Sequence, residues 1–188
     1  ACYDTYVTKG ENPMNRLSTI SLSALTAIAT LAPGAIAGQS NYQHHMTLGQ
    51  TVRSVGLNFK INPSECWAKD AYGWYWAAKN EMVICQERAT RVGVETYWTD
   101  EDLDTLRHEA QHLIQDCMDG SKDGRLDAVY NKPIALAVSV LGEDGAKGVV
   151  EAYSDASEHI KVMELEAFAV AAMNDPMEQV SDIKKYCF

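Results

Sequence analysis

Apolar residues recur at three- and four-residue intervals between Thr99 and Met118, which is the spacing of a helix with one apolar face. Thr99 can cap the first turn, and three acidic residues follow it where the helix dipole favours negative charge. Gly120 suits the end of the helix. The pattern predicts an amphipathic helix over residues 99–118, whose buried face consists of Leu103, Leu106, Ala110, Leu113, Ile114 and Cys117.

Upstream of this helix, shorter patterns predict a small sheet. Residues 72–78 and 81–85 flank a Lys-Asn pair and are expected to form two antiparallel strands joined by a short turn. An alternation of apolar and polar residues within residues 52–61 predicts another strand, with a half-buried face formed by Leu57, Phe59 and Ile61.

Downstream, residues 134–141 and 148–173 have helical patterns and are separated by the turn-forming residues 142–145. The second stretch is largely apolar but carries several glutamates. The elements together predict one small α+β domain, in which a short antiparallel or mixed sheet packs on the 99–118 helix and on a second, glutamate-bearing helix.

The N-terminal part has the pattern of an export signal. Within residues 14–37, Arg16 is followed by an apolar stretch, and Ala35-Ile36-Ala37 has the form of a small-x-small cleavage site. We therefore expect an N-terminal extension over residues 1–37 and a single domain over residues 38–188. His44-His45 is interpreted as a solvated pair in the new N-terminal tail. A buried helix within the fold is the alternative for residues 14–37, and the protein would then be cytoplasmic.

Composition and charge limit the partners and the cellular compartment that we expect for the chain. The chain has 188 residues and a formal net charge of −10, with no basic cluster, so we expect no nucleic-acid partner. Residues 17–37 are diluted by Ser, Thr and Gly, which argues against a permanent membrane span. Cleavage after Ala37 would leave an even set of cysteines, able to form two disulfides in a secreted, periplasmic or extracellular protein with three possible pairings: Cys66, Cys85, Cys117 and Cys187.

The predicted 99–118 helix contains the sequence His108-Glu109-Ala110-Gln111-His112. Residues four apart lie on one face of a helix, so both imidazoles can bind the same metal ion, with Glu109 beside the open coordination position. One Zn²⁺ held by two imidazoles and a carboxylate keeps a fourth position for water and lowers the pKa of that water. Glu109 is then the predicted catalytic base.

The third ligand should come from the glutamate-bearing helix, because no His follows at the spacing used by metzincins. After Lys161 that helix is almost wholly apolar apart from Glu164 and Glu166. Ionised carboxylates are costly in such surroundings unless they are paired or bound to metal. The two lie about 200° apart around a helix, so only one of them can reach the ion.

These motifs resemble the gluzincins, zinc metallopeptidases with H-E-x-x-H on one helix and a metal-binding Glu on the next. Their second helix often reads E-x-x-A, and in the CAAX-prenyl endopeptidase and ImmA/IrrE-like branches E-x-E-A. Residues 164–167 match the latter form, which assigns Glu164 as the ligand; Glu166 is the alternative, because residues 166–169 also satisfy E-x-x-A. Phe168 follows where the family usually has Asp or Asn. His112-x-x-Gln115 is similar to the H-E-x-x-H-x-x-Q variant of small bacterial and phage zincins.

The resemblance implies a zincin-like domain that hydrolyses peptide bonds in an extended peptide or protein substrate. It also implies an edge strand that pairs with the substrate, for which residues 81–85 are the candidate, and an oxyanion stabiliser, for which His159 and Tyr153 are the candidates. The leading hypothesis is a small secreted zinc endopeptidase. The alternative is a non-enzymatic, disulfide-stapled binding or virion/envelope-associated domain with a structural metal site. The sequence leaves the oligomeric state open.

Overall fold

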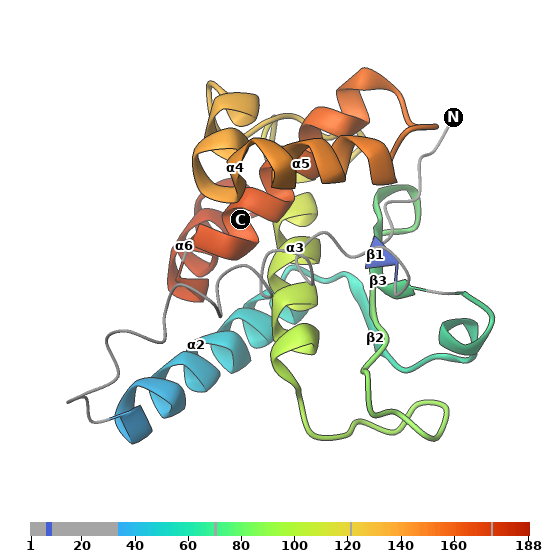
Figure 1. The fold of residues 1–188 in the computed structure, drawn as a ribbon. Coiled ribbons are helices and arrows are strands. Elements are labelled where there is room, and N and C mark those ends of the chain that lie inside the picture. The colour runs from blue at the N-terminus through green and yellow to red at the C-terminus, as the bar shows by residue number, and fades with distance from the viewer. Residues whose placement is uncertain (1–6, 9–33, 70, 121, 174) are drawn as a thin grey trace.

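The computed structural model describes residues 7–8, 34–69, 71–120, 122–173 and 175–188, which form an α+β domain, as predicted. Helix α3 (Asp100–Cys117) stands at the centre of the fold (Figure 1). It contacts the sheet through β3 (Ala71–Trp76) and β4 (Glu81–Ile84), and it contacts the helices α2 (Gly34–Ser54), α5 (Glu158–Met173) and α6 (Pro176–Tyr186).

Helix α3 begins where the sequence predicts, because Thr99 and Asp102 cap each other. The Thr99 hydroxyl accepts a hydrogen bond from the Asp102 backbone N–H, and the Asp102 carboxylate accepts one from the Thr99 N–H. Gly120 follows the last turn with a positive φ of 82°. All six residues of the predicted apolar face are buried, and they form the main core with the sheet, α2 and α6.

The sheet is mixed, and its strand order corrects one prediction. Strand β4 lies between β3, which is antiparallel to it, and β2 (Asn58–Ile61), which is parallel to it. The predicted substrate-binding strand 81–85 is therefore wrong, because β4 is paired on both sides. Strand β3 in turn lies between β4 and the two-residue strand β1 (Val7–Thr8), which pairs antiparallel with it at Gly73 and Ala71.

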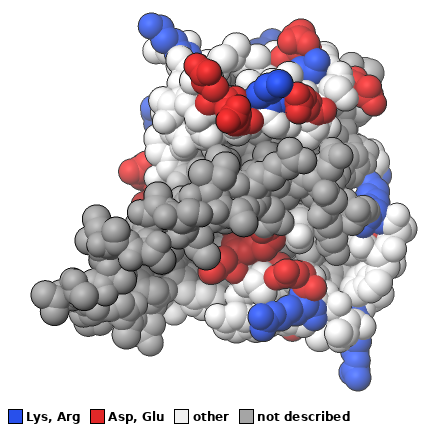
Figure 2. Space-filling model, in the orientation of Figure 1, with Lys and Arg blue, Asp and Glu red and all other residues white. Residues whose placement is uncertain are grey.

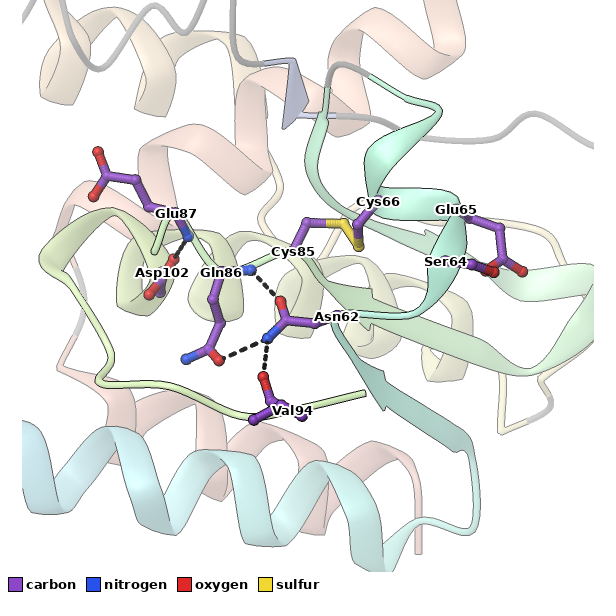
Figure 3. Close-up of a disulfide and its surroundings, with 9 residues drawn as sticks. All are labelled: Asn62, Ser64, Glu65, Cys66, Cys85, Gln86, Glu87, Val94 and Asp102. Atoms are coloured by element: carbon purple, nitrogen blue, oxygen red, sulfur yellow. Dashed lines mark hydrogen bonds between the residues drawn. A yellow bond between two sulfur atoms is a disulfide. The ribbon is translucent and has the colours of Figure 1, made fainter. Parts of the chain in front are cut away.

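Two disulfides, Cys66–Cys85 and Cys117–Cys187, give one of the three pairings left open by the sequence. The first joins the short 3-10 helix η1 (Ser64–Trp67) to the end of β4. Beside it, the buried amide of Asn62 donates to the Gln86 side chain and to the Val94 carbonyl, and accepts from the Gln86 N–H (Figure 3). This network fixes the long connection that leads from β4 to α3. The second disulfide joins the end of α3 to the residue after α6.

Helix α2 corrects the interpretation of His44-His45 as a solvated tail. Both residues lie within α2, where His45 is 2 % exposed and bonded to the Asn41 carbonyl, and His44 contacts Asp175 across to α6. The predicted cleavage site, Ala35-Ile36-Ala37, lies in the first turn of α2. Residues 14–33 lie outside the described residues, so the export signal stays a prediction.

The predicted helix 148–173 is two helices, whereas the predicted interruption within residues 142–145 is present as a kink at Gly142. Gly142 lies within the range of α4 (Pro133–Ala152), and its non-helical φ of 75° and ψ of 169° divide that range into two helical parts. The chain then breaks at residues 153–157, where the Ser157 hydroxyl accepts from the Ile160 N–H and starts α5. Helices α4 and α5 pack together. Because the chain breaks between them, Tyr153 follows α4 and does not lie on α5, the helix that carries Glu164. Helix α6 was not predicted.

On the face drawn in Figure 2, described Lys and Arg side chains lie beside Asp and Glu and do not merge into one basic patch. Among helices of the described residues, none is both long and apolar enough to cross a membrane.

Candidate metal centre

Helices α3 and α5 bring three ligand-type side chains together in the interior. His108 and His112, one turn apart on α3, have their Nε2 atoms 3.0 Å apart. The Glu164 carboxylate on α5 lies 3.2 Å from Nε2 of His108 and 3.4 Å from Nε2 of His112. Each of these side chains is at most 1 % exposed. This buried group can hold a metal ion, and within the described part of the chain it is the one such group of three His, Cys, Asp or Glu residues.

The lone pairs of these side chains face one another in a way that fits a cation. Among the described residues, neither carboxylate oxygen of Glu164 has a partner with hydrogen-bond geometry, although both imidazoles are within ion-pair distance. Two imidazoles and one carboxylate are a donor set that suits zinc with a position left open. A buried carboxylate without hydrogen bonds is costly, and a bound cation would remove that cost.

Glu166, the alternative third ligand, points away from the two histidines. Its carboxylate accepts hydrogen bonds from four donors at 3.0–3.1 Å, which are the backbone N–H groups of Val129 and Tyr130 and the side-chain amides of Gln111 and Gln115. The structure therefore groups Glu164, and not Glu166, with His108 and His112. The position of Glu166 also explains how a second glutamate is tolerated in the apolar helix α5.

The three ligand-type residues shift one another's pKa values. Burial lowers the pKa of His108. Burial also lowers the pKa of His112, but the negative charge of Glu164 outweighs it and raises the value to about 9. For Glu164, burial raises the pKa, yet the charge of His112 and the close contacts with both imidazoles lower it to about 2. Without a metal, the group therefore holds an ionised carboxylate and a protonated His112 at neutral pH.

Glu109, the predicted base, lies fully buried between this group and the sheet. Burial is the main cause that raises its pKa to about 8, and the nearby charge of Glu164 acts in the same direction. Strand β3 passes very close to it at Gly73. A Cβ atom at that position would lie 3.5 Å from Cγ of Glu109 and only 2.7 Å from Cγ2 of Thr105 and from the Val83 carbonyl oxygen. Glycine is thus required for β3 to approach the base.

The two histidines have different surroundings behind them. Nδ1 of His112 lies 2.8 Å from the side-chain oxygen of Gln115. Nδ1 of His108 is buried and has no hydrogen-bond partner in the described part of the chain, and the ring of Phe168 packs on the imidazole with centroids 4.4 Å apart. Metal-binding histidines usually donate from the second nitrogen to an oxygen, so only His112 has the usual support.

The two candidates for the oxyanion stabiliser, Tyr153 and His159, lie in different places. Tyr153 lies at the site, because after burial the charges of Glu164 and Glu109 are the next causes that raise the pKa of its phenol. His159 lies elsewhere: its Nε2 is 2.7 Å from the Leu126 carbonyl oxygen, outside the metal-ligand group. Gly73 and Gln111 were missed by sequence reasoning. Gln111 stands inside the motif, but no residue pattern indicates that it contacts Glu166.

Both disulfides are of the kind that forms and persists in an oxidising, extracellular environment. Comparisons with curated proteins and with solved structures find no match to the chain. The comparison with protein families finds a match that covers residues 39–188 and thus includes α3, α5 and the whole candidate metal centre. Because this match covers most of its length, the chain belongs to the family described as Domain of unknown function (DUF8637).

Proposed function

We propose that the protein is a zinc-dependent endopeptidase of gluzincin type, exported to an oxidising compartment. The observation that carries the proposal is the convergence of His108, His112 and Glu164 beside the buried carboxylate of Glu109. The same ligand types occur in catalytic zinc sites that have three protein ligands. The match to a family of unknown function neither adds to the proposal nor opposes it.

In this proposal His108, His112 and Glu164 hold one Zn²⁺, which supplies a Lewis acid that activates water and polarises a carbonyl group. Glu109 takes the proton from the attacking water and later gives it to the leaving amine. Tyr153, whose phenol lies near Glu164 and Glu109, would donate a hydrogen bond to the developing oxyanion.

The substrate in this proposal is an extended peptide that replaces the two-residue strand β1 as the neighbour of β3. The backbone of β3 at Gly73 passes beside Glu109, and β1 already pairs antiparallel with β3 at this residue. Strand addition supplies main-chain hydrogen bonds without a requirement for particular side chains. A peptide bound in the place of β1 would lie next to the proposed base.

The test uses the full chain and its Glu109→Gln variant. We expect one zinc per chain in both proteins by metal analysis, and hydrolysis of an unfolded protein substrate by the parent only. Glutamine keeps the shape of the side chain but cannot accept the proton. A parent without zinc, or a variant that cleaves as fast as the parent, would exclude the peptidase.

A structural metal site is the second candidate, favoured by the complete burial of the ligands and of Glu109. A non-enzymatic binding domain of this kind would hold the metal without turnover. Zinc that stabilises the chain against unfolding in parent and variant alike, with no hydrolysis by either, would support this candidate.

A further inference from the structure

Behind the metal-ligand group lies a buried chain of hydrogen bonds that joins Glu166 to His112 through Gln115. Nε2 of Gln115 donates to the Glu166 carboxylate at 3.1 Å and to the Met163 carbonyl at 3.1 Å. Oε1 of Gln115 lies 2.8 Å from Nδ1 of His112. The side chains of Glu166, Gln115 and His112 are all 0 % exposed. We propose that Glu166 and Gln115 are positioning residues that orient His112 for metal binding.

The orientation of the Gln115 amide follows from its two acceptors. A carboxylate and a carbonyl can only accept, so the NH₂ group must face Glu166 and Met163. Rotation of the amide by 180° would place its oxygen against both acceptors and its NH₂ group against His112. The amide oxygen therefore faces His112 and accepts a hydrogen bond from the Nδ1 proton, both when His112 is protonated and in the neutral form that a metal ion requires. In that neutral form the proton stays on Nδ1, so the lone pair of Nε2 is left for the metal ion.

Glu166 is held in place by more than Gln115. The backbone N–H groups of Val129 and Tyr130 donate to its two carboxylate oxygens, and Gln111 donates to one of them. Four donors and no acceptor surround the carboxylate, which is the environment of an ionised group. Glu166 thus anchors the connection between α3 and α4 to the metal-ligand group. This role distinguishes it from Glu164, its neighbour two residues earlier.

This inference rests on the zinc site of the proposed function, but its test does not require hydrolysis. The probe is zinc itself. In the full chain, Gln115→Met keeps the size of the side chain and removes the amide that faces His112. Gln111→Met is the matched control, because it removes a buried amide that also donates to Glu166 but does not touch a histidine. We expect Gln115→Met to weaken zinc binding about 10- to 100-fold, and Gln111→Met about threefold at most. Glu166→Gln, which keeps the shape of the carboxylate, should weaken it about tenfold.

Nitrogen-15 NMR of the zinc-loaded parent gives a readout that general destabilisation would not move. It should show His112 bound through Nε2 with a hydrogen-bonded Nδ1 proton, and Gln115→Met should lose that hydrogen-bonded signal. Coordination through Nδ1 in the parent, or equal affinity losses in Gln115→Met and Gln111→Met, would overturn the positioning role. A parent that binds zinc with the expected variant effects but hydrolyses no peptide would leave this role intact and remove the peptidase.

Discussion

The ring of Phe168 packs against the imidazole of His108, with centroids 4.4 Å apart, and Nδ1 of this histidine has no hydrogen-bond partner among the described residues. The gluzincin-like motif usually has Asp or Asn at the position of Phe168. The two histidines of this site are therefore held differently, His112 by the oxygen of Gln115 and His108 by packing. The difference should limit how strongly the site binds metal.

Replacing Phe168 with Asn should tighten zinc binding, because the Asn side-chain oxygen can accept the Nδ1 proton of His108. We expect an increase in affinity of about tenfold, the lower end of the effect of such supporting groups. Phe168→Leu is the control, since it also removes the buried ring but supplies no acceptor. Chelator competition measures both affinities. Equal affinities for the Asn and Leu variants would show that an acceptor at this position does not reach His108.

The candidate site was more predictable than the fold around it. A helix fixes residues four apart on one face, so the sequence alone places His108 and His112 together, and capping by Thr99 fixes where their helix begins. The choice between Glu164 and Glu166 needed the structure. It depends on the Val129 and Tyr130 backbone N–H groups, which reach Glu166 across the tertiary fold and leave no local pattern.

The errors in the fold have physical causes of the same kind. Helix α2 has few strong apolar residues, and the sequence predicts a solvated His44-His45 pair there instead of a helix, yet Leu48 and Val52 are 0 % exposed because α6 and α3 pack on them. The alternation of residues along a strand does not show the order of strands in a sheet. The sequence therefore could not show that β4 lies between β3 and β2 and is not an edge strand. Gly142 interrupts α4 with non-helical backbone angles, as its turn-forming neighbours predict, but the interruption is shorter than residues 142–145.

The raised pKa of Glu109 should make the metal-free protein lose stability as pH rises. Burial raises this pKa from 4.5 to about 8 in the folded chain, so the folded state binds more protons than the unfolded state between these values. The contribution of Glu109 to the free energy of unfolding therefore falls by about 1 kcal/mol per pH unit across that window. Glu109→Gln removes this penalty, so its stability advantage over the parent should grow from pH 5 to pH 8.

Denaturant unfolding in EDTA at several pH values measures that difference. Glu143→Gln, at an exposed position of α4, is the control and should give a difference that does not vary with pH. If the Glu109→Gln and parent curves run parallel from pH 5 to pH 8, then Glu109 does not titrate in this range.

Zinc binding should release a proton at neutral pH and become tighter as pH rises. Burial alone would lower the pKa of His112, but Glu164 raises it to about 9 in the metal-free chain. At pH 7 His112 is thus protonated and must lose its proton to bind metal, whereas Glu164, with a pKa of about 2, is already ionised. The affinity should increase up to about tenfold per pH unit between pH 6 and pH 8. Calorimetry in buffers of different ionisation enthalpy counts the protons released, and zero at pH 7 would contradict the raised pKa of His112.

Gly73→Ala should disrupt the contact between β3 and α3 that places the backbone of β3 beside Glu109. The added Cβ would lie 2.7 Å from both the Val83 carbonyl oxygen and Cγ2 of Thr105, and a backbone atom cannot move away cheaply. We expect a loss of about 1–3 kcal/mol in the free energy of unfolding, the usual cost of overpacking. Gly49→Ala is the matched control, because its Cβ would meet nothing closer than 3.6 Å within helix α2, where alanine is the better helix former. Thermal unfolding should therefore show a lower midpoint for Gly73→Ala and an unchanged or higher one for Gly49→Ala. Equal midpoints for the Gly73→Ala variant and the parent would mean that β3 can move away from Glu109 at no cost, and that glycine is not what sets their approach.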